Sequence, residues 1–291
     1  MVASAGEDAL IKLWRLSDGG LVGSLAGHSG PVASIAVSPD GALLASASAD
    51  TTVKLWNLAD GSLLATLAGH ALGVTSVAFS ADGRVLASGS ADATIKLWSP
   101  AGGAPTATLV GHSDGVTALA ISPDGTYLVS AARDASIRSW SIPDGGVIAA
   151  LPLDAIVLAL ALSLDGTQLL SAGAGDGITS WIMPSFAVDK VLTHTSGGTE
   201  ALALSPDKST LASGGTSDTV QVWRMTDGKQ ARTINDHTDA INALAITPDG
   251  QTLVTGSADR SVRYWRLSDG KFLGNADDPT LPLRTVVSFS C

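Results

Sequence analysis

Residue types that could support hydrolysis recur along the chain at matching distances from one another. In one set, Ser88 lies 18 residues after His70 and four before Asp92, and three further sets repeat this order. A serine activated by a histidine that an aspartate orients is the arrangement of a nucleophilic hydrolase. An active site does not normally occur four times in one chain at nearly equal intervals. The repetition therefore favours a structural role for these residues, and we predict no catalytic residue and no enzyme activity.

Two glycine-containing segments could also indicate chemistry. Segment 111–115 reads Gly-His-Ser-Asp-Gly, which matches the nucleophile elbow G-x-S-x-G, but that motif needs a helix after its turn. Here it lies between two segments that are typical of strands. Segment 173–177 reads Gly-Ala-Gly-Asp-Gly and resembles a phosphate-binding loop, but it opens no helix either. Both segments are better explained as tight turns.

Composition and charge argue against several ligand classes. Acidic residues outnumber basic ones by 27 to 17, which gives a net charge of −10. Nucleic-acid binding would need clustered basic side chains with free aromatic ones, and neither is visible. Five basic residues each lie two positions before a tryptophan, and we expect their stems to cover the sheet with the charges in water. They are Lys12, Lys54, Lys96, Arg138 and Arg263.

Metal and cofactor sites are not indicated either. The five histidines are spread through the chain at distant, matching points, so we expect no convergence on a metal ion. The one cysteine, Cys291, excludes a disulfide within the chain. No apolar run approaches the roughly 20 residues that a membrane-spanning helix needs. We therefore predict no metal, no cofactor, no nucleic-acid partner and no membrane insertion.

The elements that position these residues follow from a strict period. All seven tryptophans belong to one series with spacings of 42, 42, 42, 41, 42 and 42 residues. A serine or threonine precedes each of them by ten residues, and an aspartate by five or six. The tryptophans are Trp14, Trp56, Trp98, Trp140, Trp181, Trp223 and Trp265. A period of this length is typical of a repeat architecture.

Each repeat contains four short segments rich in Val, Ile, Leu and Thr. In one repeat these are Val32–Val37, Leu43–Ser48, Thr52–Trp56 and Leu63–Leu67, separated by turn residues such as the Ser-Pro-Asp-Gly of segment 38–41. The segments are too short for helices and are bounded by Gly, Pro and Asp, so each is predicted to be a strand. Seven repeats of four antiparallel strands make an all-β, seven-bladed β-propeller that forms a single domain over residues 1–291.

The two ends of the chain are predicted to complete one blade together. Residues 2–6 have the pattern of a second strand, and residues 286–290 have the pattern of a first strand. The N-terminal blade, residues 1–26, would then be completed by a strand at 283–290. Closing the ring in this way removes the exposed sheet edges that an open array would leave.

The repeats resemble the WD-repeat family. The resemblance rests on the Gly-His pair before a first strand, as at His28, His70 and His112, and on the tryptophan that ends the third strand. The aspartate that usually follows this tryptophan is absent in every repeat. The resemblance implies a hydrogen-bonded chain of His, Ser or Thr, Asp and Trp in four blades. These chains are His28–Ser46–Asp50–Trp56, His70–Ser88–Asp92–Trp98, His112–Ser130–Asp134–Trp140 and His237–Thr255–Asp259–Trp265.

The same resemblance implies that partners bind the wide face of the ring, near the starts of the first strands and the turns before the third strands. Most residues at these positions are small. Four stand out and are predicted to select a partner: Glu7, Arg133, Glu200 and Asn242.

The blade of Trp181 departs from the others. Asp154 stands at the expected histidine position, and the turn after the third strand contains Met183 and Phe186 where sister turns carry Asp-Gly. Pro184 restricts this turn, so presenting two apolar side chains would cost little ordering entropy. Met183 and Phe186 are predicted to form an apolar anchor for a partner, with local repacking as the alternative.

Two hypotheses for the function remain open. The resemblance implies a non-catalytic scaffold that binds protein partners, and we expect the propeller itself to be monomeric. No targeting or transmembrane segment is visible, so we expect a cytoplasmic protein. The alternative is a regulatory or sensor domain of a larger multidomain protein that includes an enzyme, because the chain ends where a further Asp-Gly turn is expected.

Overall fold

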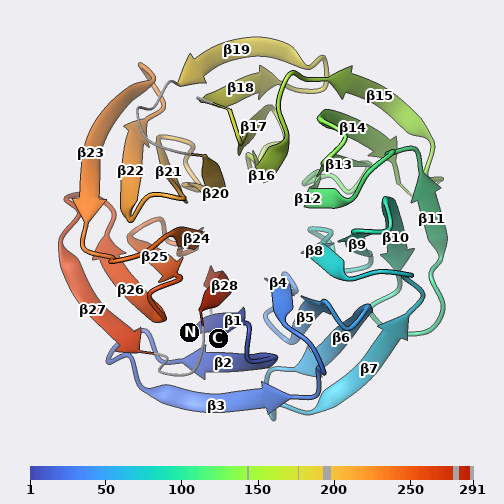
Figure 1. The fold of residues 1–291 in the computed structure, drawn as a ribbon, viewed down its shortest axis with the longest axis horizontal. Helices are drawn as coiled ribbons and strands as arrows, with labels where there is room; N and C mark the ends of the chain where they lie inside the picture. The colour runs from blue at the N-terminus through green and yellow to red at the C-terminus, as the bar shows by residue number, and fades with distance from the viewer. Residues whose placement is uncertain (143, 176, 193–197, 278–281, 289–291) are drawn as a thin grey trace.

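The computed structural model describes residues 1–142, 144–175, 177–192, 198–277 and 282–288. These residues form 28 β-strands, arranged as seven antiparallel sheets of four strands each. The sheets stand around a common axis as the blades of a propeller (Figure 1). The all-β, seven-bladed architecture predicted from the period is therefore confirmed.

The blades are numbered here from the one that contains the N-terminus. Blade 1 contains β28 (Leu283–Ser288), β1 (Val2–Gly6), β2 (Leu10–Trp14) and β3 (Leu21–Ala26). Blade 2 contains β4 (Val32–Val37), β5 (Leu43–Ser48), β6 (Thr52–Asn57) and β7 (Leu63–Ala68). Blade 3 contains β8 (Val74–Phe79), β9 (Leu86–Ser90), β10 (Thr94–Trp98) and β11 (Ala107–Val110). Blade 4 contains β12 (Val116–Ile121), β13 (Tyr127–Ala132), β14 (Ser136–Ser141) and β15 (Val147–Pro152).

The remaining blades follow the same plan. Blade 5 contains β16 (Val157–Leu162), β17 (Gln168–Gly173), β18 (Ile178–Ile182) and β19 (Ala187–Leu192). Blade 6 contains β20 (Thr199–Leu204), β21 (Thr210–Gly215), β22 (Thr219–Arg224) and β23 (Lys229–Asn235). Blade 7 contains β24 (Ile241–Ile246), β25 (Thr252–Ser257), β26 (Ser261–Arg266) and β27 (Phe272–Asp277).

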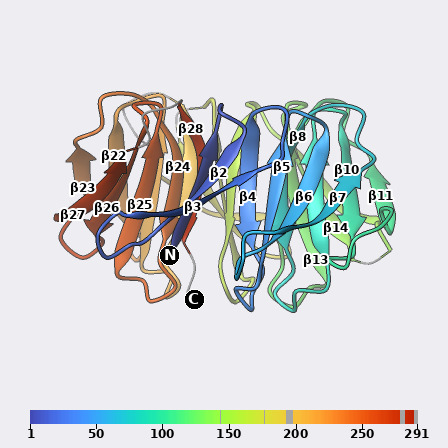
Figure 2. The same cartoon turned by 90° about the horizontal axis from the view of Figure 1, so that it is seen from below.

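The position of each strand within its blade decides where it lies in the ring. The first strands, such as β4 and β8, surround the central channel, and the fourth strands form the outer wall (Figure 1). Because neighbouring strands are antiparallel, the first strands begin on the face that carries the turns between second and third strands. We call this face the entry face. The opposite face carries the turns between first and second strands and those between third and fourth strands. We call it the turn face, and Figure 2 shows both faces edge-on.

The turns between first and second strands show why the repeat needs its Ser-x-Asp-Gly sequence. In blade 3 the Ser80 hydroxyl donates to Asp82 Oδ1 at 2.6 Å, and Asp82 accepts the Arg84 amide at 3.0 Å. Gly83 adopts φ +68°, a conformation that costs glycine little. The side chains thus satisfy the turn backbone locally, which ends one strand and starts the next.

The core lies between adjacent blades. Trp98 of blade 3 packs with Leu55 and Val53 of blade 2 and with Val74 and Val77 of its own first strand. The indole is almost fully buried, with 1% of its surface exposed. Equivalent clusters occur between each pair of neighbouring blades. Burial of these apolar surfaces is the main stabilising term, so each blade depends on its neighbours.

Ring closure by the C-terminal strand is also confirmed. Strand β28 pairs antiparallel with β1, with Ser4 opposite Val286 and Val2 opposite Ser288. On the entry face the Arg284 guanidinium donates from Nε to Glu7 Oε1 at 2.5 Å. The strand ends at Ser288, and residues 289 and 290 of the predicted segment 283–290 lie outside the described residues, as does the final Cys291.

Candidate functional site

The four predicted tetrads are hydrogen-bonded sets that lie near the entry face within single blades. In blade 3, His70 Nδ1 lies 3.0 Å from Asp92 Oδ2, and Nε2 lies 2.8 Å from Ser88 Oγ. The Trp98 indole donates to the same Ser88 hydroxyl at 2.8 Å. Sister tetrads on His28, His112 and His237 have the same contacts, with distances of 2.6 to 3.1 Å.

The network assigns one proton arrangement. Ser88 accepts from the Trp98 indole and donates to Nε2, so His70 donates from Nδ1 to Asp92. Burial lowers the pKa of His70 by more than the hydrogen bond and charge of Asp92 raise it. Burial alone would raise the pKa of Asp92, but hydrogen bonds from Thr94, the Ala71 amide and His70 outweigh it and bring it to about 2. The pair is therefore a neutral imidazole hydrogen-bonded to a carboxylate.

These tetrads have the bonding order of a catalytic triad but not its accessibility. Ser88 is fully buried, and its oxygen already accepts from an indole. A nucleophile needs an open approach for the substrate carbonyl and donors for the developing oxyanion. All seven indoles donate to the hydroxyl ten residues earlier, including those of blades 1, 5 and 6, which carry no described tetrad. The hydroxyl–indole bond is thus a framework contact of every blade.

The two glycine-containing segments are inter-strand connections. Segment 111–115 joins β11 to β12, and no helix follows it. The Ser113 amide donates to Asp134 Oδ2 at 3.0 Å, so the segment is fixed to the tetrad of its own blade. A Cβ atom at Gly111 would lie 2.9 Å from Trp140 Cη2, which explains the glycine before the histidine. Segment 173–177 joins β17 to β18, and Asp176 within it lies outside the described residues.

Two of the four predicted partner-selecting residues are exposed on the entry face. Arg133 lies in the turn between β13 and β14, and Glu200 is the second residue of β20, at the wall of the central channel. Among the described residues, neither side chain has a hydrogen-bond or ion-pair partner.

The other two are engaged in contacts between elements. Glu7 pairs with Arg284, and Asn242 Nδ2 donates to the Leu283 carbonyl of the next blade at 2.7 Å. Thr75 and Thr117 make the same type of contact, each donating to a carbonyl of the following first strand at 2.6 Å. These threonine hydrogen bonds between neighbouring first strands, in the channel wall, were not predicted from the sequence. The only signal for them is a polar residue one position after the start of a first strand.

The predicted apolar anchor in blade 5 is not presented to solvent. Met183 is 7% exposed and belongs to the core cluster with Val129 and Ile137 of blade 4 and Trp181 of its own blade. Phe186 is partly buried and packs against that cluster. The prediction that both side chains stand at the surface was wrong, and the alternative of local repacking describes this turn. The reason is that the thioether and ring fill space between two blades.

The register of blade 5 corrects the expected position of Asp154. Val157 begins the first strand of blade 5 as Val32 does in blade 2, so Leu153 stands at the position of His28. Leu153 packs against the Trp181 cluster, whereas Asp154 is exposed.

Two of the periodic lysines are not in water. Lys12 and Lys54 are 7% and 8% exposed. Their ammonium groups bond Asp8 Oδ2 at 2.8 Å and Thr66 Oγ1 at 2.9 Å.

The described part of the chain offers no cluster of three or more His, Cys, Asp or Glu side chains that could hold a metal ion. Within the same residues, no helix is long and apolar enough to cross a membrane.

Comparison with known families agrees with the repeat. The family profile WD40 (WD domain, G-beta repeat) matches residues 19–57, 61–99, 103–141, 188–224 and 228–266. Residues 142–187, which lie outside the matched segments, include the first three strands of the divergent blade 5. No curated protein matches the chain significantly. Together with the seven closed blades and the indole–hydroxyl bond in each, the profile match shows that the chain belongs to the WD-repeat family.

Proposed function

We propose that the chain is a non-catalytic adaptor that binds a protein partner on its entry face. WD-repeat propellers generally mediate protein interactions. The observation that carries the proposal is that, among the described residues of this face, some charged side chains have an ion-pair partner and others have none. Glu7 is paired with Arg284, whereas Arg133 and Glu200 are exposed without a described partner. A rigid ring that holds such side chains in fixed positions offers specific electrostatic contacts at little ordering cost.

The buried tetrads support a binding role over catalysis. Each serine or threonine that could act as a nucleophile is fully buried and is committed to an indole donor. A hydrolase would need at least one of these hydroxyls to face a cleft. We therefore propose that the whole chain acts as one structural unit that binds a partner and catalyses no reaction.

The experiment compares partner capture by charge-reversed variants. Proteins cross-linked to the immobilised wild-type chain are identified, and their affinity for Arg133→Glu and Glu200→Lys is then measured at several salt concentrations. Arg84→Glu is the matched control, because Arg84 is exposed in a turn of the opposite face. Weaker, less salt-sensitive binding by the two entry-face variants, with unchanged melting, supports the proposal. A partner that binds all three variants like wild type places the interaction elsewhere.

A further inference from the structure

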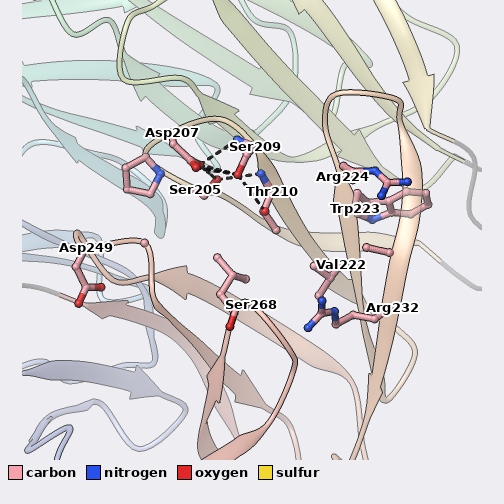
Figure 3. Close-up of a pocket in the computed structure, with 14 residues that line it drawn as sticks. Ser205, Asp207, Ser209, Thr210, Val222, Trp223, Arg224, Arg232, Asp249 and Ser268 are labelled. Carbon is pink, nitrogen blue, oxygen red and sulfur yellow. Dashed lines mark hydrogen bonds between the residues drawn. The ribbon is translucent and has the colours of Figure 1, made fainter.

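A cavity of ≈ 460 Å³ opens between blades 6 and 7 on the turn face (Figure 3). Its walls come from the β20–β21 turn, from β22 and β23, and from the two turn-face turns of blade 7. The volume lies within the range of about 300–1,000 Å³ that is typical of small-ligand sites. Apolar walls at Val222 and Leu267 are combined with polar groups at Ser209 and Ser268.

Arg232 is the unusual residue of this cavity. Its side chain extends from β23 into the space between Val222 and Ser268 (Figure 3). Its Nη1 atom is buried and has no hydrogen-bond partner in the part of the chain that the structure describes. No described residue forms an ion pair with the guanidinium. A donor without a partner costs free energy, so a guanidinium that lines a ligand-sized cavity and has no described partner points to an acceptor that a ligand supplies.

The position of Arg232 in the repeat shows that the fold does not need this cation. Arg232 lies opposite Val222 in β22, and the equivalent outer-strand positions in five other blades carry glycine or alanine. These residues are Gly23, Ala65, Ala107, Ala149 and Gly274. The blade framework is therefore complete with a small residue at this position.

Lys190 is the remaining residue at this register position and provides a direct comparison. It lies opposite Ser180 in blade 5, and its Nζ donates to the Met225 carbonyl of the next blade at 3.0 Å. Asp189 Oδ2 lies 3.5 Å from the same ammonium group. Lys190 thus joins two blades, whereas the guanidinium of Arg232 in the equivalent place has no described partner.

The other charges of the cavity restrict the ligand. Arg224 is already paired with Asp227 through two hydrogen bonds of 3.0 and 2.7 Å. Across from Arg232 lie Asp207 and Asp249 (Figure 3). Hydrogen bonds from Ser205 and from Thr247 respectively keep the pKa of these two carboxyl groups below its usual value, so both are negatively charged. Among the described residues, a dianion such as phosphate would meet one free cation and two carboxylates. A group with one negative charge would instead balance the single charge of Arg232.

We propose that this cavity binds a peptide whose carboxylate pairs with Arg232 and whose cationic side chain lies near Asp207 and Asp249. The planar guanidinium suits a carboxylate, because its donors can bond both oxygens together. The carboxylate is either a chain terminus or an acidic side chain. The site lies on the face opposite Arg133 and Glu200, so it is independent of the entry-face proposal.

Three synthetic probes test the proposal by calorimetry. The first is N-acetyl-lysyl-glycyl-glycine with a free C-terminal carboxylate, and the second is the same peptide with an amidated terminus. The third is amidated N-acetyl-lysyl-glycyl-aspartate, which carries only a side-chain carboxylate. Binding of the first or third probe with more than about tenfold weaker binding of the second supports the proposal and identifies the source of the carboxylate. Equal binding of all three, absence of binding, or equal competition by inorganic phosphate overturns it.

Matched variants separate ligand binding from a structural role. Arg232→Ala introduces the residue that three sister blades carry, so it should fold, melt no lower than wild type and lose the carboxylate probe. Lys190→Ala should melt lower and bind the probe normally. Asp249→Asn should weaken the binding of the lysine-containing probe but not the binding of N-acetyl-triglycine. If Arg232→Ala lowers the melting temperature like Lys190→Ala and still binds the probe, Arg232 is a structural residue and the proposal fails. Arg133→Glu should bind the probe normally, which separates this test from that of the entry face.

Discussion

His70 lies between Ser88 and Asp92 with almost none of its side chain in contact with water. A buried imidazole, carboxylate and indole each need a hydrogen-bond partner, and the tetrad supplies all of them within one blade. The four tetrads are therefore polar parts of the core, and their contribution to stability is shared among their members.

Removal of one member of a tetrad should destabilise the ring. His70→Ala and Asp92→Ala should each lower the free energy of unfolding by about 1–3 kcal/mol, because buried partners lose their hydrogen bonds. The double variant should cost less than the sum, because the second change removes a contact that is already broken. Urea denaturation of the two single variants and the double variant measures the coupling. Strict additivity would contradict a shared network.

The tetrads also predict how stability changes with pH. The pKa of His70 is lowered from 6.5 by burial, so below pH 6.5 the unfolded chain binds more protons than the folded one. The stability contributed by the neutral imidazole is present above pH 6.5 and is lost as the pH falls through the lowered pKa. Asp92, with a pKa of about 2 against 3.8, contributes stability that is present above pH 3.8 and is lost as the pH falls towards 2.

Melting temperature should therefore fall between about pH 7 and pH 5, and again below about pH 4. His28, His112 and His237 have pKa values shifted in the same direction, so the first decrease sums over several blades. His70→Gln should reduce the slope of the first decrease. A melting temperature that is constant from neutral pH to pH 5 would contradict a neutral buried imidazole.

The turns between strands fix the backbone conformation of the residues that they contain. Turns between second and third strands hold non-glycine residues at positive φ, including Thr51 at +72°. The turn of blade 5 places Phe186 at φ +55°, where the sister turns of blades 1 and 2 have Gly19 and Gly61. The left-handed region is costly for residues with a Cβ atom and most costly for β-branched ones.

Thr51→Gly should stabilise the protein by up to about 1 kcal/mol, because glycine relieves this conformation and only part of the gain is lost to unfolded-state entropy. Thr52→Gly is the matched control. Thr52 is in β6 and its hydroxyl donates to Asp50 Oδ1 at 2.7 Å, so its removal should destabilise. Thermal melts of the two variants decide the point. A destabilised Thr51→Gly would show that the threonine side chain makes a compensating contact.

The turn of blade 5 provides a second test. Met183→Ala should lower the free energy of unfolding by about 2–5 kcal/mol, because the thioether fills the core between blades 4 and 5. Ile182→Ala next to it should have an effect within about 0.5 kcal/mol, because Ile182 is 49% exposed. Chemical denaturation compares them directly. Similar small effects at both positions would mean that Met183 is accessible after all.

At the scale of the whole molecule, closure joins the two ends of the chain into one sheet. Strand β28 covers the edge of β1, where Val2 and Ala3 are fully buried. It also contributes Leu283 and Val286 to the core between blades 7 and 1. Stability should therefore depend on a strand that is separated from its partner by nearly the entire sequence.

Deletion of residues 283–291 should expose the edge of β1 and the apolar surface of blade 7. We expect aggregation or a large decrease in melting temperature, because an unpaired edge strand is a template for intermolecular pairing. Size-exclusion chromatography and thermal melting measure both outcomes. Arg284→Ala is the control, because it removes only a partly exposed ion pair and should change stability by about 1 kcal/mol or less. A truncated chain that remains monomeric with unchanged melting would contradict closure as a stabilising contact.

Features that depend on local spacing could be predicted from the order of the amino acids. Ser88 and Trp98 lie on neighbouring strands of one hairpin, so their bond repeats wherever the ten-residue interval repeats. For the same reason the period was sufficient to predict the strands, the blades and the closing strand. The contacts between blades could be seen only in the folded ring. Asn242 bonds a carbonyl 41 residues away, and Glu7 pairs with a residue 277 positions later.

The burial of Met183 and the lack of a partner for Arg232 among the described residues have the same origin. Each depends on how closely the neighbouring blade approaches. This distance is set by the packing of large side chains between the sheets, and the spacing of residues within one blade does not encode it. Lys190 and Arg232 occupy equivalent positions in the repeat, yet among the described residues only the lysine bonds a carbonyl of the next blade. The pattern of the chain thus specifies the repeat, and the contacts between repeats decide which side chains remain available to a partner.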